Sequence, residues 1–294
     1  DYLLLRCRST SMALATLLSL QKMFLRAVDR IIVPTVNHIR YGSGLQDMQD
    51  KCTLIPFGLD ASTLEKTCIS NVLSKELQSK YGPYAFFLGR LVPYKGLEYL
   101  IEAMRDVNHN LIIAGDGPER GRLEALVAQY QMKDKIHFLG SVENQELYKA
   151  LYHACQMVVL PSITAVENFG MIQLEAMCAS KPVITTDLKS GVPIVGEPGR
   201  TNLIVPPRNS ELLSEAINYL FNNPIEAKRM GTMGHQRFEN MYTLEKMIQG
   251  HISLYTELIH QFRLERGLEV RHNTPVIPFP QSPLSAVDKK KKAA

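Results

Sequence analysis

The chain has 294 residues, enough for two domains of ordinary size or one large α/β domain. Hydrophobic residues make up 45% and charged residues 21%, which excludes a largely disordered chain. The formal net charge of +4 arises entirely within residues 271–294, so the rest of the chain is neutral and offers no basic face for nucleic acid.

The first 58 residues predict a short unit. A long apolar helix at about 11–28 leads to a strand at Arg30–Val33, a loop rich in Gly and Asn, and a strand at Lys51–Pro56. Two strands with one or two helices cannot close a doubly wound sheet by themselves. Because the chain also begins at Asp1, we expect a piece of a longer protein in which this unit is the back end of a first domain.

From residue 84 onward, short β-rich runs alternate with helical patterns, which predicts repeated βα units, a parallel sheet and an α/β fold. The first three strands are almost continuously apolar, as expected of strands covered on both faces. The predicted strands are Tyr84–Leu88, Asn110–Ala114, Lys135–Leu139, Gln156–Leu160, Pro182–Thr185 and Asn202–Val205. The predicted helices are 95–105, 118–130, 143–153, 170–179, 209–222, 224–240 and 243–265.

A pair of cations follows the first of these strands. Gly89-Arg90 comes directly after the strand, and Lys95-Gly96 opens the next helix. Arg can bind two phosphate oxygens as a fork and Lys adds a point charge beside free backbone N–H groups, so this turn is a candidate diphosphate site. The alternative is that Arg90 and Lys95 are ordinary surface cations.

Glycines also follow the next two strands. Gly115-Asp116-Gly117-Pro118 resembles a dinucleotide-binding fingerprint, but its third glycine, Gly121, comes one position late. We therefore favour a plain turn and helix start, with backbone contact to a ligand as the alternative. Gly140 follows its strand in the same way.

The segment 161–177 carries two acids at the carboxyl end of a buried strand, where open α/β sheets bind ligands. Gly170 leaves the backbone open at a helix start, whose N–H groups can receive an anion. Glu167 and Glu175 would repel a phosphate unless they bind neutral hydroxyl groups, which favours a sugar nucleotide over a free polyphosphate. The alternative is a helix-start charge at Glu167 and a solvated Glu175.

Other catalytic patterns are missing from the sequence. It contains no Asp-x-Asp or Glu/His cluster with metal-ligand spacing, so we expect neither a metal nor another cofactor. It also contains no Gly-x-Ser-x-Gly elbow and no phosphate-binding P-loop.

Taken together, these segments resemble glycosyltransferase family 4, the retaining enzymes with two Rossmann-like domains known as the GT-B fold. The likeness runs from about residue 30 to 260 and implies one complete Rossmann-like domain and the C-terminal remnant of a second. Asn202 stands where the family usually has glycine, and we expect it to keep a left-handed turn. The matching motifs, in order, are Phe87 to Gly96, Ile113 to Pro118, Phe138 to Gly140, and Glu167 with Glu175-Ala176-Met177.

The resemblance implies a role for each matched position. Arg90 and Lys95 would neutralise the donor diphosphate and stabilise the leaving group. Glu167 would contact the donor sugar near the reacting carbon, which makes these three the expected catalytic residues, and Glu175 would bind the ribose hydroxyls. The other expected donor-binding residues are Gly89, then Gly140 and Ser141 beside the base, and the backbone of Phe169, Gly170 and Met171.

The same resemblance divides the chain. Residues 1–58 would be the remnant of an N-terminal acceptor domain, residues 59–242 the sugar-nucleotide donor domain, and residues 243–268 a helix that crosses back. The tail, 269–294, is rich in proline and is predicted to be disordered.

We therefore expect a transferase that moves a hexose from a nucleoside diphosphate sugar to a polysaccharide or lipid-linked glycan, with retention of configuration. Two alternatives stay open: a non-catalytic sugar-nucleotide-binding module that needs a separate acceptor domain, and a GT-B-like epimerase. Five cysteines without a Cys-x-x-Cys pair favour a reducing, cytoplasmic location. Lys289–Lys292 could add peripheral membrane contact, or could form a solvated tail.

Overall fold

The computed structural model describes residues 8–268; Cys7 and the tail at 269–294, with Lys289–Lys292, lie outside the described residues. The chain divides into two compact units. One unit holds the residues up to Ile55 together with those from Gly250, and the other is Pro56–Gln249.

The smaller unit is built on two short parallel strands, β1 (Ile31–Val33) and β2 (Cys52–Leu54). Parallel strands need a crossover between them. The crossover contains α2 (Val36–Tyr41) and a 3₁₀ turn at Gln46–Lys51, where the sequence suggested only a loop. The predicted N-terminal helix is α1 (Arg8–Ala27).

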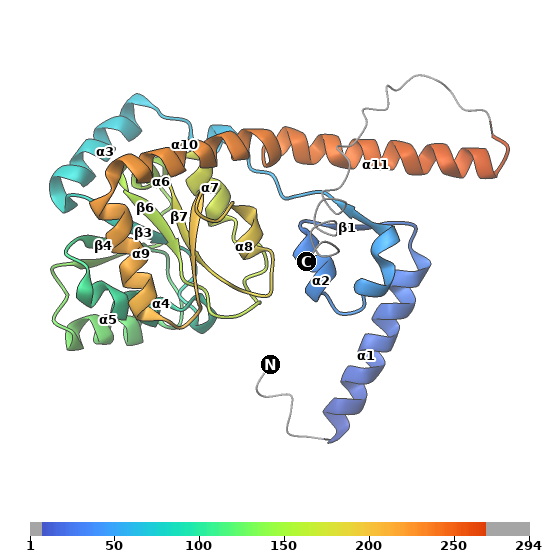
Figure 1. The fold of residues 1–294 in the computed structure, drawn as a ribbon, viewed down its shortest axis with the longest axis horizontal. Helices are drawn as coiled ribbons and strands as arrows, with labels where there is room; N and C mark the ends of the chain where they lie inside the picture. Colours follow the sequence, from blue (N-terminus) through green and yellow to red (C-terminus); the bar gives the residue numbers. More distant parts are fainter. Residues whose placement is uncertain (1–7, 269–294) are drawn as a thin grey trace, which may run out of the picture. The chain divides into compact units, whose positions relative to one another are not determined.

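The larger unit contains a parallel sheet of six strands in the spatial order β5-β4-β3-β6-β7-β8, with helices on both faces (Figure 1). This confirms the α/β class and the parallel sheet that the alternating pattern predicts. The strands are β3 (Tyr84–Leu88), β4 (Asn110–Ala114), β5 (Ile136–Gly140), β6 (Met157–Leu160), β7 (Val183–Thr186) and β8 (Asn202–Val205). The helices are α3 (Cys68–Tyr81), α4 (Leu97–Ala103), α5 (Arg120–Gln129), α6 (Gln145–Ala154), α7 (Ile172–Cys178), α8 (Val192–Val195), α9 (Ser210–Asn222) and α10 (Pro224–Met241). Helix α11 (Leu244–Glu265) begins in this unit, and its residues from Gly250 onward belong to the smaller unit.

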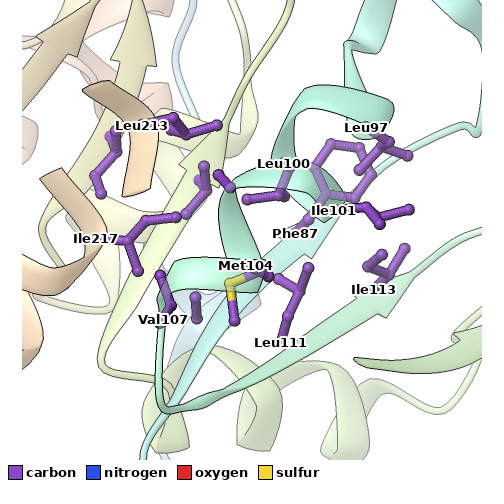
Figure 2. Close-up of a cluster of buried hydrophobic side chains, with 14 of the residues drawn as sticks. Phe87, Leu97, Leu100, Ile101, Met104, Val107, Leu111, Ile113, Leu213 and Ile217 are labelled. Carbon is purple, nitrogen blue, oxygen red and sulfur yellow. The ribbon is translucent and has the colours of Figure 1, made fainter. Parts of the chain in front are cut away.

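The sheet separates two hydrophobic cores, because successive side chains of a strand point to opposite faces. On β3, Ala85 and Phe87 join the core under α4, α5 and α9, whereas Tyr84 and Phe86 join the core under α6 and α7. Figure 2 shows the first core, where side chains of α4 and α9 gather with those of β3 and β4. Burial on both faces explains why these strands are mostly apolar.

The direction of strand addition reverses at β3. From β3 the chain adds β4 and β5 on one side and then returns to place β6 on the other. In open α/β sheets, the loops at the carboxyl ends of two such strands leave room for a ligand. The fold therefore favours a site between the loop after β3 (89–96) and the loop after β6 (161–171).

Helix α3 occupies a stretch for which the sequence suggested no element. Its signal is a capping box, in which Thr67 Oγ1 accepts from the Ser70 N–H at 3.0 Å and Ser70 Oγ accepts from the Thr67 N–H at 2.8 Å. No helix of the described part has the length and apolar character needed to cross a membrane.

The expectation for Asn202 is wrong. This residue is fully buried as the first residue of β8 and does not have a positive φ. The left-handed position is Gly199, with a φ of 73°. A Cβ on Gly196 would lie 2.5 Å from the Asn202 side chain, so Asn202 fills the space beside a glycine instead of forming the turn.

Candidate functional site

The loops that follow β3 and β6 pack directly against each other. The N–H of Ile163 donates to the Tyr94 carbonyl at 2.8 Å. Gly96 has a φ of 67°, and a Cβ there would lie 2.2 Å from the Pro161 carbonyl oxygen. A side chain at this position would strain the backbone and push the loops apart, which explains the glycine. This packing brings Lys95 next to the loop that carries Glu167.

Lys95 and Glu167 form the central contact of the site. Lys95 Nζ lies 2.5 Å from Glu167 Oε2, and the two side chains are only 13% and 10% exposed. The Ser162 hydroxyl donates to the same carboxylate oxygen at 2.8 Å. An ion pair buried to this degree differs from a pair of solvated surface charges. The structure therefore does not support the interpretation of Lys95 as an ordinary surface cation.

Two further hydrogen bonds fix the loop around this ion pair. The Thr186 hydroxyl, at the end of β7, donates to the Ser162 carbonyl. The N–H of Glu167 donates to the Thr164 carbonyl at 3.1 Å and closes a turn. The backbone of the loop that carries Glu167 is therefore held both by its own turn and by the neighbouring strand.

Glu175 lies on α7 in the same neighbourhood. Its carboxylate accepts a hydrogen bond from the Tyr152 hydroxyl. Burial raises the pKa of Glu175, while hydrogen bonds from Tyr152 and Tyr148 and the charge of Lys95 oppose that rise. A buried carboxylate with these partners is not the solvated face residue that the alternative interpretation required.

Arg90 lies on the same loop as Lys95, but its side chain is exposed. Its neighbour Leu91 is fully buried and is held by the loop after β4: the Leu91 N–H donates to the Asp116 carbonyl at 2.9 Å, and the Glu119 N–H donates to the Leu91 carbonyl at 3.1 Å. Within residues 8–268 the Arg90 guanidinium makes no ion pair or side-chain hydrogen bond. It is thus a cation at the sheet edge whose charge no described acid neutralises.

The glycines that follow β3 and β4, and the one that ends β5, let three neighbouring chain segments approach closely. A Cβ on Gly115 would lie 2.0 Å from the Gly89 carbonyl oxygen, and one on Gly117 would lie 2.3 Å from that of Leu91. Gly140, with a φ of 72°, accepts a hydrogen bond from the Gly115 N–H at 2.7 Å and precedes the exposed Ser141. Packing between loops therefore accounts for Gly115 and Gly117 without a dinucleotide.

Phe169, Gly170 and Met171 connect the Glu167 loop to α7. The Phe169 side chain is buried and packs edge-on against Phe57, with ring centroids 5.1 Å apart. Only the backbone of Phe169 can therefore face a ligand. Its carbonyl already accepts from Gln173 Nε2 at 3.0 Å. Gly170 has a φ of 74°, and a Cβ there would lie 2.5 Å from Leu160 Cδ2, so any other residue would strain the backbone and displace the Leu160 side chain. In this part of the described chain, the N–H groups of Gly170 and Met171 have no backbone acceptor.

This arrangement places an ammonium and two carboxylates at the strand reversal. A bound diphosphate would compete with Glu167 for Lys95, and a displaced Glu167 could then accept a hydroxyl of the ligand. Among residues 8–268 there is no group of three or more His, Cys, Asp and Glu side chains able to hold a metal ion.

The sequence pattern did not indicate three residues of the site: Ser162, Tyr148 and Tyr152. Ser162 stands next to a proline at the end of a strand, where a serine commonly belongs to a turn. Tyr148 and Tyr152 are four residues apart on a helix with other apolar residues, so the pattern indicates only core packing. Their contacts with Glu167 and Glu175 arise from the tertiary structure.

The chain is similar in sequence to known glycosyltransferases. A family model described as glycosyl transferases group 1 matches residues 71–237. An O-antigen chain mannosyltransferase from Escherichia coli is 31% identical over 82% of this chain and 64% of that protein. A D-rhamnosyltransferase from Pseudomonas aeruginosa is 30% identical over 76% of this chain and 58% of that protein. The chain thus spans less than two thirds of either relative.

Solved structures share the fold. Sucrose-phosphate synthase from Thermosynechococcus elongatus superimposes with a TM-score of 0.72 and 26% identity, over 83% of this chain and 62% of that one. The Anabaena protein HepE, solved in complex with UDP, superimposes with a TM-score of 0.70 and 20% identity, over 79% of this chain and 65% of that one. These likenesses confirm the GT-B type of fold, and since the family model covers more than half of its residues, the chain belongs to the glycosyl transferases of group 1.

Proposed function

We propose that this chain binds a nucleoside diphosphate sugar between the loops after β3 and β6. The observation that carries the proposal is the buried ion pair of Lys95 with Glu167 at the strand reversal. Glu175 lies close enough for the charge of Lys95 to lower its pKa. A cation beside acids with hydrogen-bonding partners suits a ligand that combines a diphosphate with hydroxyl groups.

Each expected residue has a role in this proposal. Arg90 and Lys95 bind the diphosphate and stabilise it as it leaves, and no metal is required for this step. Glu167 contacts the donor sugar, and Glu175 accepts hydrogen bonds from the ribose hydroxyls. Gly89, Gly140 and Ser141 border the nucleoside, and the backbone of 169–171 faces the sugar and phosphate.

The reaction of the whole protein would be transfer of a hexose, with retention, to a polysaccharide or lipid-linked glycan, as in glycosyltransferase family 4. The bond between the sugar carbon and the diphosphate oxygen breaks, the acceptor oxygen bonds to that carbon, and the acceptor proton leaves with the nucleoside diphosphate. The names of the relatives, an O-antigen chain mannosyltransferase and a D-rhamnosyltransferase, support the transfer of a sugar, and the first also supports a glycan acceptor. A cytoplasmic protein with peripheral membrane contact fits such an acceptor.

A second candidate is a non-catalytic sugar-nucleotide-binding module that needs a separate acceptor domain. The observation that favours it is the coverage of the relatives, since the chain matches 64% and 58% of their lengths. Both candidates require donor binding and differ only in whether this chain transfers the sugar unaided.

Titration calorimetry of the chain with UDP, GDP, ADP and their sugars tests the proposal. We expect one nucleoside diphosphate to bind, and Arg90→Ala and Lys95→Ala each to weaken it about tenfold or more. Binding that is equal in all three proteins would remove the diphosphate assignment. In a protein that transfers sugar, Glu167→Gln should reduce transfer more than it reduces donor binding, and equal losses would reduce Glu167 to a binding residue.

A further inference from the structure

A tyrosine beneath the site makes a specific contact with Glu175. Tyr152, on α6, is fully buried, and its hydroxyl donates to Glu175 Oε2. Its ring lies edge-on against Phe86 of β3, with centroids 5.1 Å apart and an interplanar angle of 89°. A ring packed in this way leaves the hydroxyl little freedom to move, so the phenol is a fixed donor.

Tyr148 lies one turn earlier on the same helix and faces the same carboxylate. Its ring packs against the Tyr152 ring, with centroids 5.3 Å apart. Burial raises the pKa of Tyr148, and the charge of Glu175 and a hydrogen bond to it raise that pKa further. Both phenols are therefore neutral donors at any working pH, and two residues of one helix hold the Glu175 side chain.

The electrostatic surroundings of Glu175 come from three elements. The phenols lie on α6, Lys95 lies on the loop after β3, and Cys178 lies one turn further along α7. Burial disfavours the charged form of Glu175, and the two phenols and Lys95 favour it. Without the Tyr152 hydroxyl, the buried carboxylate would lose a charge-assisted hydrogen bond.

We propose that Tyr152, assisted by Tyr148, is a positioning residue that fixes the Glu175 carboxylate so that its remaining acceptor positions receive the two hydroxyls of a ribose. An ionised carboxylate offers about four acceptor positions, and the Tyr152 hydroxyl occupies one of them on Oε2. The acceptor positions that remain can receive both hydroxyls of the vicinal diol of a ribonucleoside, which a dideoxynucleoside lacks. This inference rests on the proposed function, because it assigns the ribose specificity of the same site.

The test compares the parent chain with Tyr152→Phe, which removes only the hydroxyl. Calorimetry would measure the dissociation constants of UDP, GDP and ADP and of their 2′,3′-dideoxy counterparts, with inorganic pyrophosphate as a probe that lacks ribose. We expect the parent to prefer the ribose form, and Tyr152→Phe to reduce that preference about tenfold while pyrophosphate binding stays within about twofold. Tyr84→Phe is the matched control, since its buried hydroxyl donates to the Leu151 carbonyl at 2.9 Å and not to Glu175.

Two further variants separate positioning from structural support. In a Glu175→Gln background, Tyr152→Phe should cause no further loss of ribose preference, because the group it acts through has already changed. Tyr148→Phe should give a smaller loss in the same direction, and it carries the test if Tyr152→Phe fails to fold.

The possible failures are distinguishable. If the parent binds none of the three nucleoside diphosphates, the proposed function fails and this inference with it. If the parent prefers the ribose form but both phenylalanine variants keep its preference, the positioning role is refuted while the proposed function stands. A parent that binds ribose and dideoxy forms equally overturns the assignment of Glu175 to ribose.

Discussion

Replacing Lys95 by methionine removes the ammonium group and keeps most of the side chain's volume. The Glu167 side chain is 10% exposed, and among residues 8–268 its carboxylate would then keep only the Ser162 hydroxyl as a hydrogen-bond partner. Breaking a buried ion pair costs about 3–5 kcal/mol, and breaking an exposed one about 1 kcal/mol or less. Because both side chains retain slight exposure, we expect Lys95→Met to lower the free energy of unfolding by about 2 kcal/mol.

The same change should weaken nucleoside diphosphate binding. A hydrogen bond to a charged group contributes about 1.5–3 kcal/mol, which corresponds to roughly a tenfold to hundredfold loss of affinity. Arg90→Ala should weaken binding similarly but leave stability unchanged, since Arg90 is exposed and makes no ion pair within the described residues. Lys133→Ala, an exposed cation on the loop that precedes β5, is the control that should change neither property.

Urea unfolding and calorimetry on these variants separate the two effects. Glu167→Gln removes the charge that Lys95→Met leaves unpaired, so the double variant should be more stable than Lys95→Met by about 1 kcal/mol. Strictly additive losses of stability would refute the energetic coupling of the two residues. A Lys95→Met variant that matches the parent in both assays would show that the buried ion pair does not form in solution.

Three other changes test different parts of the structure. Gly170→Ala should destabilise the protein by about 2 kcal/mol or more, because the alanine would have a left-handed φ and would clash with Leu160. Gly121→Ala, in α5 with no atom within 4 Å of the added Cβ, should be neutral or stabilising by about 0.5–1 kcal/mol. Thermal unfolding that ranks the two variants the other way would contradict the backbone argument. Because burial raises the pKa of Glu175, the parent loses stability as pH rises from the ordinary glutamate range through that higher pKa. Glu175→Gln does not ionise, so its stability relative to the parent should increase as pH rises through this range. A difference in urea unfolding that stays constant from the ordinary glutamate range upward would exclude a raised pKa. Burial raises the pKa of the Cys155 thiol to about 11, so at pH 8 only about one molecule in a thousand carries the thiolate. Peptide mapping after iodoacetamide treatment should find Cys155 unmodified in the native protein and modified in urea. The exposed Cys68 is the control and should react under both conditions.

The sheet was predictable because a buried parallel strand has a local signature. Tyr84–Leu88 and Asn110–Ala114 are almost entirely apolar and each is followed directly by a glycine, and the structure gives them these same limits. Helix α3 was not predictable from apolar periodicity, since most of its residues face solvent and its clearest signal is the capping box at Thr67. The left-handed backbone predicted for Asn202 is wrong, because the prediction came from a family preference for glycine at this position. The residue instead has the backbone conformation of the first residue of β8.

The candidate site divides in the same way between local and long-range information. The residue types and their order indicated Arg90, Lys95, Glu167 and Glu175 as candidate site residues. The first three lie on loops that follow strands, and Glu175 lies in the first turn of a helix, all at the edge where parallel sheets bind ligands. Their partners did not follow from the pattern. The hydroxyls that hold the two carboxylates, from Ser162 and Tyr152, belong to residues that look like turn and core positions.

The amino-acid sequence by itself determined the α/β class, the parallel strands and the chemical character of the sheet edge, since hydrophobic period and turn residues are local properties of the chain. Only the tertiary structure decided that Lys95 meets Glu167, 72 residues away, and that a tyrosine of α6 holds Glu175. The physical reason is the strand order: β6 lies beside β3 after an excursion through β4 and β5, and no local pattern specifies which loops that reversal brings together.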